Sequence, residues 1–334
     1  MDEQKTLVSI IVRTKDRPKL LKRALQSIAG QTYRPIEVVL VNDGETIADL
    51  IPFEAMMPDI SLRYLENNHR GRTAAANLGL TKSEGVFVGF LDDDDVFYHD
   101  HVSTLVYFLK SSDYRVAYTE SYFVHSEYDP ESRCIVQTQK YPAKTMDFSR
   151  ETLLFYNYIP FMCLMFERSV LENVKGFDEK FDMCEDWDLT IRVSKNFPFQ
   201  HISKITAEYH IWSRDFQSIQ KNDHLLVYRR KIYQKHVNQF SPEMISAFIF
   251  NGYWANLKYL EDRIHTLDSV IAKKEEEIQE IQREKQGLEK ESELLQAENE
   301  RIEKEYSQLE GYVRGNTIKF PKRLKSILKS FLRG

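Results

Sequence analysis

The sequence predicts an α/β fold in which a mostly parallel sheet is flanked by helices and is followed by a long C-terminal coiled-coil helix. Two observations carry this prediction. Up to residue 91, short continuous apolar runs alternate with segments of helical spacing, as in a parallel sheet covered on both faces. From Leu257 onward, apolar residues recur with alternating steps of three and four, which is the repeat of a coiled coil.

The strands and helices of the first part can be assigned in order. Short apolar runs at residues 7–12, 36–41, 61–65 and 86–91 each predict a strand, and most of these should be buried. Residues 18–29 and 72–80 predict helices, and Pro18 suits a first helical position. Further strands are expected at residues 115–118 and 121–125, in a less regular second half.

Three polar clusters follow the predicted strands, at residues 14–17, 42–44 and 92–95. Ligands of parallel α/β sheets bind beyond the carboxyl ends of the strands, so we expect the three clusters to form one site. Taken singly, each cluster could also be ordinary loop chemistry. No GxGxxG or GxxxxGK[ST] motif follows the first strand, so phosphate is more readily held by a metal and by cations.

Four adjacent aspartates, residues 92–95, end the strand at residues 86–91. Carboxylates this close repel one another, which predicts a bound positive charge. Mg²⁺ or Mn²⁺ fits best, because these ions take oxygen ligands and are usually shared with substrate phosphates. The alternative is a solvated acidic turn that begins a helix, since aspartate is favoured at helix N-caps.

A second acidic group lies at residues 178–188. Glu185 and Asp186 precede a predicted amphipathic helix at residues 189–193, and acids near a helix N-terminus can simply stabilise it. Trp187, if it is buried beside the two acids, favours a cleft over an open surface.

In their order and spacing, five motifs resemble those of the family 2 glycosyltransferases with the GT-A fold. The resemblance covers roughly residues 5–215 and rests on VSIIVRTKDRP (8–18), EVVLVNDG (37–44), GRTAAANLG (71–79), FLDDDD (90–95) and GFDE with EDWDL (176–179 and 185–189). It implies a mixed, mostly parallel sheet. The family commonly has arginine where Ala76 stands, and here Arg72 is expected to supply that charge.

The resemblance also implies an activity. It implies inverting, metal-dependent transfer of a sugar from a UDP- or dTDP-linked donor to a hydroxyl of a glycan or lipid-linked acceptor, in bacterial surface polysaccharide synthesis. Asp186 matches the general base and Glu185 its neighbour. The residues expected to bind the donor are Thr14, Arg17, Asp43, Arg72, Asp92 and Asp93, and those expected to bind Mn²⁺ or Mg²⁺ are Asp94 and His210. His210 on its own could equally be structural.

The heptad repeat predicts an oligomerisation element. Isoleucine dominates one apolar position and leucine the other, which favours a parallel two-stranded coil, and Asn299 would fix its register. The partner could be a second copy of the chain or another coiled-coil protein. The alternative is a single solvated helix that packs on its own domain.

Residues 318–334 form a basic tail in which Leu324, Ile327, Leu328, Phe331 and Leu332 share a helical face. A basic amphipathic helix suits an anionic membrane surface, so peripheral membrane contact is expected. A docking helix for a protein partner is the alternative. The sequence thus divides into a catalytic domain (1–215), a helical connector (216–255), a coiled coil (256–310) and the tail (311–334).

Composition limits the remaining classes. A formal net charge of −5 argues against a general nucleic-acid binder. Three cysteines without CxxC spacing argue for a reducing compartment, and no apolar run approaches the ~20 residues that span a bilayer. We therefore expect a cytoplasmic protein at the inner face of the cell membrane. A non-catalytic scaffold that binds a sugar nucleotide and recruits partners through its coil is the main alternative function.

Overall fold

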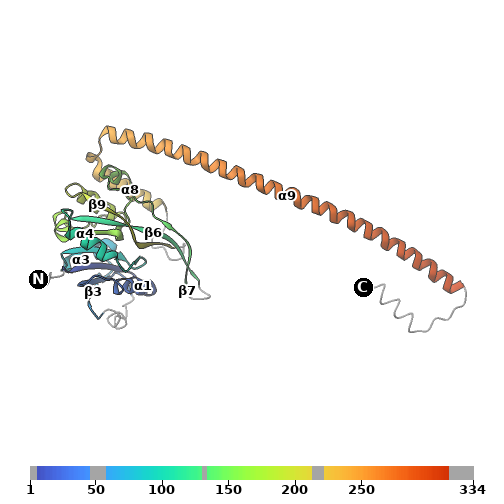
Figure 1. The fold of residues 1–334 in the computed structure, drawn as a ribbon, viewed down its shortest axis with the longest axis horizontal. Coiled ribbons are helices and arrows are strands. Elements are labelled where there is room, and N and C mark those ends of the chain that lie inside the picture. The colour runs from blue at the N-terminus through green and yellow to red at the C-terminus, as the bar shows by residue number, and fades with distance from the viewer. Residues whose placement is uncertain (1–5, 46–57, 130–133, 213–221, 316–334) are drawn as a thin grey trace. The chain divides into compact units, whose positions relative to one another are not determined.

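The computed structural model describes residues 6–45, 58–129, 134–212 and 222–315. Within these residues, nine strands form one mixed sheet in the order β3-β2-β1-β4-β8-β6-β9-β5, and β7 pairs with β6 (Figure 1). The strands are β1 (Val8–Thr14), β2 (Ile36–Asn42), β3 (Ile60–Glu66), β4 (Phe87–Asp92), β5 (Val96–Phe97), β6 (Val116–Asp129), β7 (Cys134–Pro142), β8 (Leu164–Glu167) and β9 (Phe199–Trp212). The α/β fold with a mostly parallel first part is confirmed.

Helices cover both faces of the sheet. They are α1 (Pro18–Ala29), α3 (Arg72–Lys82), α4 (His101–Lys110), α5 (Arg150–Phe155), α6 (Arg168–Asn173), α7 (Glu185–Ser194), α8 (Asn222–His236) and α9 (Pro242–Gly315), with 3₁₀ turns η1 (Phe161–Cys163) and η2 (Val237–Gln239). Apolar residues of α1 and α4 pack in one core, and those of α3, α5, α6, α7 and α8 pack in a second. Because both faces are covered, β1 and β2 are buried at every residue.

The first half places strand ends together. β1, β2, β3 and β4 are all parallel, so Thr14, Asn42 and Asp92 lie at one edge of the sheet. Helix α3 crosses this half closely, because a Cβ on Gly79 would lie 2.5 Å from the Cγ2 of Ile11. The predicted convergence of the three polar clusters at one edge follows from this topology.

The second half departs from the predicted pattern. The two strands expected at residues 115–118 and 121–125 are one long strand, β6, because irregularities around Glu120 shift its pairing with β9 without ending it. β8 runs antiparallel to both β4 and β6, which makes the sheet mixed. Helix α7 begins at Glu185, so the acids expected before the helix form its first turn.

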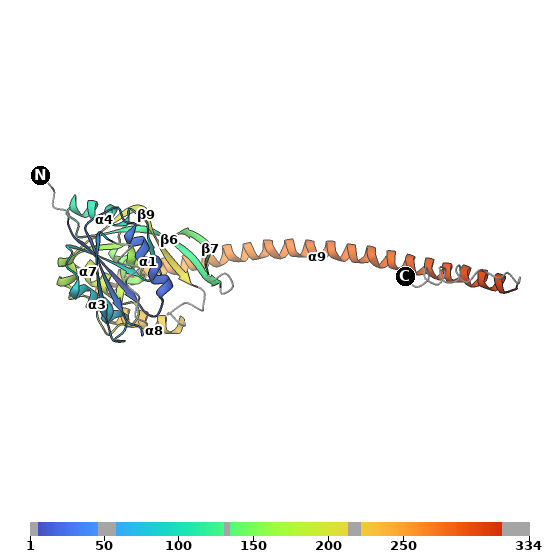
Figure 2. The ribbon, with the colours of Figure 1, turned by 90° about the horizontal axis from the view of Figure 1, so that it is seen from below.

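The chain divides into two compact units, residues 1–248 and 249–334. Helix α9 is continuous over 74 residues, which confirms the long C-terminal helix (Figure 2). None of the described helices is both long enough and apolar enough to cross a membrane. The four-part division of the chain stays a prediction, and the tail at residues 318–334 lies outside the described residues.

Candidate active site

A cavity of about 480 Å³ lies at the carboxyl edge of the sheet. Its walls come from the ends of β1, β4 and β9, from the start of α7 and from residues 156–162. The charged residues among its lining are Arg13, Arg72, Asp92, Asp95, Lys144, Glu185 and Asp186. The structure therefore brings the first and the second acidic group of the sequence to one cavity.

Two arginines join these acidic groups. Arg13 stands opposite Asp92 in the β1–β4 register, and its Nε donates to Asp92 Oδ1 at 2.8 Å while Nη1 donates to Glu185 Oε1 at 2.9 Å. Arg72, in the first turn of α3, lies 2.9 Å from Glu185 Oε1 and 3.4 Å from Asp92 Oδ2. Burial alone would raise the pKa of Asp92, but the charges of Arg13 and Arg72 outweigh burial and lower it.

The next aspartates are held by the loop after β1. Asp93 has no exposed side-chain surface, accepts from Thr14 Oγ1 at 2.7 Å and is paired with Arg17. Arg17 Nη1 also donates to Asp94 Oδ2 at 2.9 Å. Burial is the main cause that raises the pKa of Asp93, to about 7, and the pKa of Asp94, and neighbouring carboxylates add to it. Arg17 thus supplies part of the positive charge that the four-aspartate run requires.

Asp95 is bound by β9 rather than by the loop after β1. Its Oδ1 accepts the backbone N–H of His210 at 2.9 Å, which ties the loop after β4 to β9. Burial and the nearby charge of Asp94 raise the pKa of Asp95 well above its ordinary value. Asp95 therefore fixes the geometry of the acidic loop.

Asp186 is the half-buried acid on the α7 side of the cavity. Its Oδ2 accepts from Asn157 Nδ2 at 3.1 Å. Burial and the charge of Glu185 raise the pKa of Asp186 to about 6. A carboxylate with a pKa just below neutrality can accept a proton at pH 7, which is the requirement for a general base.

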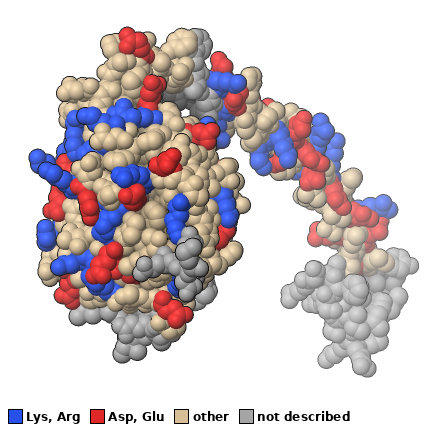
Figure 3. Space-filling view, turned by 60° about the vertical axis from the view of Figure 1, so that its left-hand side comes forward, with Lys and Arg blue, Asp and Glu red and all other residues tan. Residues whose placement is uncertain are grey.

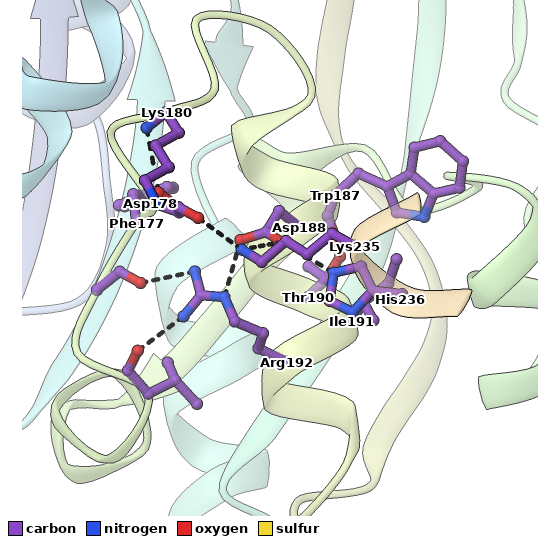
Figure 4. A network of polar contacts seen from close by, with 12 residues as sticks. Phe177, Asp178, Lys180, Trp187, Asp188, Thr190, Ile191, Arg192, Lys235 and His236 are labelled. Atoms are coloured by element: carbon purple, nitrogen blue, oxygen red, sulfur yellow. Dashed lines mark hydrogen bonds and ion pairs between the residues drawn. The ribbon is translucent and has the colours of Figure 1, made fainter. Parts of the chain in front are cut away.

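The first turn of α7, which begins at Glu185, is anchored to α8 through Asp188 (Figure 4). Asp188 is fully buried and accepts from Arg192 Nε at 2.8 Å, from Lys235 Nζ at 2.6 Å and from His236 Nε2 at 2.8 Å. Arg192 in turn donates to the carbonyls of Val174 and Gly176. These bonds hold the first turn of α7, and with it the two acids that line the cavity, against neighbouring segments.

Six predicted residues do not line this cavity: Thr14, Arg17, Asp43, Asp93, Asp94 and His210. The contacts of Asp43 and His210, which lie apart from the Arg17 cluster, are with other parts of the protein. Asp43 Oδ1 accepts from Asn67 Nδ2 at 2.6 Å and from the backbone N–H of Gly71 at 3.1 Å. His210 has no exposed side-chain surface. Its Nδ1 lies 2.8 Å from Ser126 Oγ, and its Nε2 lies 3.1 Å from Arg23 and 3.2 Å from Glu208.

The donor atoms present fit a metal that is shared with a substrate rather than one held in a protein cage. Among the described residues, no group of three or more His, Cys, Asp or Glu side chains is arranged to hold a metal ion. The carboxylates of Asp92 and Asp94 are 31% and 22% exposed, so their oxygens can be reached. Mg²⁺ is commonly bound by one or two carboxylates together with substrate phosphates. The enclosed imidazole of His210 does not fit a ligand role in this arrangement.

Sequence reasoning missed some of the site and left other points open. Arg13 and Asn157, which contact Asp92 and Asp186, were not predicted; charge balance between the two acidic groups could have indicated Arg13, but no signal marks Asn157. Trp187 is buried as the cleft prediction supposed, but it packs in the core, its Nε1 donates to the carbonyl of Leu153 at 2.6 Å, and it does not line the cavity. Ala76 is also fully buried, whereas Arg72 faces the cavity.

Sequence comparisons identify the family. The family described as "Glycosyl transferase family 2" matches residues 9–174. An uncharacterized glycosyltransferase of Bacillus subtilis, YwdF, is 27% identical over 210 residues, which are 60% of this chain and 73% of that protein. The chondroitin synthase of Pasteurella multocida is 26% identical over 242 residues, which cover 70% of this chain but only 24% of the synthase.

Solved structures share the fold. Residues 1–349 of S. aureus TarS, in complex with UDP-GlcNAc, match with a TM-score of 0.53 and 20% identity, over 69% of this chain and 66% of that one. The mannosyltransferase PcManGT from Pyrobaculum calidifontis matches with a TM-score of 0.52 and 16% identity, over 74% and 69% of the two chains. This likeness shows the GT-A-type fold, and the sequence match shows that the chain belongs to the family 2 glycosyltransferases.

Proposed function

We propose that this chain is an inverting, metal-dependent glycosyltransferase. It would move a sugar from a UDP- or dTDP-linked donor to a hydroxyl of a glycan or lipid-linked acceptor in bacterial surface polysaccharide synthesis. The observation that carries the proposal is that Asp92 and Asp186 line one cavity, in which Arg13 and Arg72 link Asp92 to Glu185, the neighbour of Asp186 in the chain. The TarS complex with UDP-GlcNAc and the chondroitin and hyaluronan synthases among the relatives support the type of donor and product.

On the donor side, Asp94 together with Asp92 would hold Mn²⁺ or Mg²⁺. A bound divalent ion neutralises the negative charge that the leaving diphosphate acquires. Arg72 faces the same cavity and can pair with a phosphate. We assign Thr14 and Asp93 to holding Arg17 beside Asp94, since their contacts are to one another. Asp43 remains the proposed contact of the nucleobase, from the family resemblance alone.

On the acceptor side, Asp186 would accept the proton of the attacking hydroxyl. The oxygen of that hydroxyl bonds to the anomeric carbon as the bond from that carbon to the diphosphate oxygen breaks on the opposite face, which inverts the configuration. The hydrogen bond from Asn157 to Oδ2 of Asp186 would orient this carboxylate towards the acceptor. Glu185 is engaged by Arg13 and Arg72, so we assign it a positioning role.

Metal and donor dependence tests this proposal. The purified chain is incubated with Mn²⁺ and a panel of UDP- and dTDP-sugars, and release of the nucleoside diphosphate is measured. We expect the chain to hydrolyse one class of donor slowly. This hydrolysis should stop in EDTA and return when Mn²⁺ or Mg²⁺ is added. Asp94→Asn should lose it, whereas Asp113→Asn, at an exposed position, should not. Undiminished hydrolysis in EDTA would contradict the metal role.

The same assay separates the enzyme from a scaffold. A non-catalytic scaffold would be stabilised against heat by UDP and Mn²⁺ but would never consume a donor.

We further propose that the protein works in the cytoplasm at the inner membrane face, where a lipid-linked acceptor would be reached. The basic, amphipathic sequence of residues 318–334 supports this location.

A further inference from the structure

Helix α9 carries a long apolar stripe that is open to solvent between residues 261 and 310. We call its a and d heptad positions the seam: residues 264, 267, 271, 274, 278, 281, 285, 288, 292, 295, 299, 302, 306 and 309. Ile264, Ile278 and Leu288 are 57%, 53% and 66% exposed. A repeating apolar stripe of this length marks a surface that another helix covers.

The seam is bordered by acids. We call the e and g positions the flanks: residues 261, 263, 268, 270, 275, 277, 282, 284, 289, 291, 296, 298, 303, 305 and 310. Eleven of these fifteen residues are Asp or Glu and only Arg263 is basic. Basic side chains do occur along α9 (Figure 3), but they lie mostly outside the flanks. Since the flanks face the partner in a coiled coil, their charge decides which partner can bind.

A second copy of this chain is a poor partner for the seam. In a parallel pair, each g residue faces the e residue five positions later on the other helix. Glu284 would then face Glu289, and Glu298 would face Glu303. In an antiparallel pair, e residues face e residues and g residues face g residues, so acids again oppose acids. In the parallel arrangement, three of the seven g–e pairs oppose two acids, three pair an acid with an uncharged residue, and only Arg263 with Asp268 is attractive.

Two lysines in the seam add to the repulsion between two copies of this chain. Lys274 Nζ lies 2.5 Å from Glu277 of its own helix, and Lys285 Nζ lies 3.7 Å from Glu289. In an in-register parallel pair of identical chains, each lysine would face its own copy across the seam. A partner that places acids there would remove this repulsion.

We propose that the seam binds a helix of a different protein. That helix has apolar a and d positions, Lys or Arg at most of its e and g positions, and acids opposite Lys274 and Lys285. The tail at residues 318–334 is basic, but its 17 residues are too few to cover a seam of seven heptads. The partner site lies in α9 and does not depend on the catalytic assignment.

Two synthetic peptides and the full chain test the proposal. The basic peptide has the sequence of residues 261–310 with every flank acid replaced by lysine and with glutamate at both seam lysines. The control peptide keeps the natural sequence. At pH 7 and low salt, we expect the full chain to sediment as a monomer at micromolar concentration and to bind the basic peptide at least ~10-fold more tightly than the control. Leu288→Gln should weaken that binding, and so should 1 M salt.

A gain of function provides the second arm. Changing Glu284, Glu298 and Glu305 to lysine in one full-length variant turns the three acid–acid g–e pairs into attractive ones, so this variant should dimerise where the natural chain does not. Self-association of the natural chain that is lost in Leu288→Gln would overturn the proposal. So would equal binding of the two peptides, or binding of neither.

Discussion

Asp186 is half-buried and lines the cavity. Burial and the charge of Glu185 raise its pKa to about 6. Only the carboxylate form can accept a proton, so the transfer rate should fall as the pH drops below about 6 and should level off above it. Asp186→Asn should lower kcat by ~10²–10⁴-fold and abolish this acidic limb while donor affinity is kept. Steady-state kinetics across pH 5–8, with donor binding by calorimetry, provides the measurement.

Asp182→Asn is the matched control, because Asp182 lies in the preceding loop and contacts only the exposed Tyr228 hydroxyl among its hydrogen bonds in the described residues. It should leave both kcat and the pH profile unchanged. Near-normal turnover by Asp186→Asn would remove the base assignment.

At the scale of elements, Asp188 joins α7 to α8 through three cationic or imidazole partners. Burial opposes its charge, but His236, Arg192 and Lys235 outweigh burial and lower the pKa of Asp188 to about 2. Asp188→Asn leaves the basic groups without a buried counter-charge and should lower the free energy of unfolding by about 3–5 kcal/mol. Urea denaturation at pH 7 measures this loss.

The pH dependence has a definite sign. Because the folded pKa of Asp188 is lower than its unfolded pKa, its stabilisation is present above about pH 4 and is lost as the pH falls towards 2. Asp178→Asn serves as control, since Asp178 is 28% exposed and pairs with Lys235 alone among the basic groups of this network. That variant should lose less than about 1 kcal/mol. Equal losses in the two variants would contradict the proposed anchoring.

The elements that sequence reasoning predicted best are those whose pattern is local. The strands β1, β2 and β4 fall within one or two residues of their predicted bounds, because burial on both faces leaves an unbroken apolar run. Helix α1 matches its predicted bounds because its buried residues recur at helical spacing after Pro18. The antiparallel insertion of β8 between β4 and β6 was not predicted, because pairing partners far apart in sequence leave no local pattern. For the same reason the contact of Arg13 with Glu185, 172 residues away, could not be predicted.

At the scale of the whole molecule, charge is unevenly distributed. The flanks of α9 are acidic, whereas no acid follows Glu310 and the tail is basic. Deleting residues 318–334 should abolish binding to vesicles that contain anionic lipid and leave donor hydrolysis intact. Vesicle co-sedimentation measures this, with neutral vesicles as the control. Unchanged binding to anionic vesicles would exclude the tail as the membrane contact.

The shared guanidinium of Arg13 affects how mutations at this site must be interpreted. Removing the charge of Asp92 leaves Arg13 to Glu185 alone, so the two acids do not behave as independent sites. In a double-mutant cycle of Asp92→Asn and Glu185→Gln, we expect a coupling energy of about 0.5–3 kcal/mol in donor hydrolysis. Such coupling would link the proposed donor side thermodynamically to the proposed acceptor side, so that a substitution on one side also lowers the function of the other.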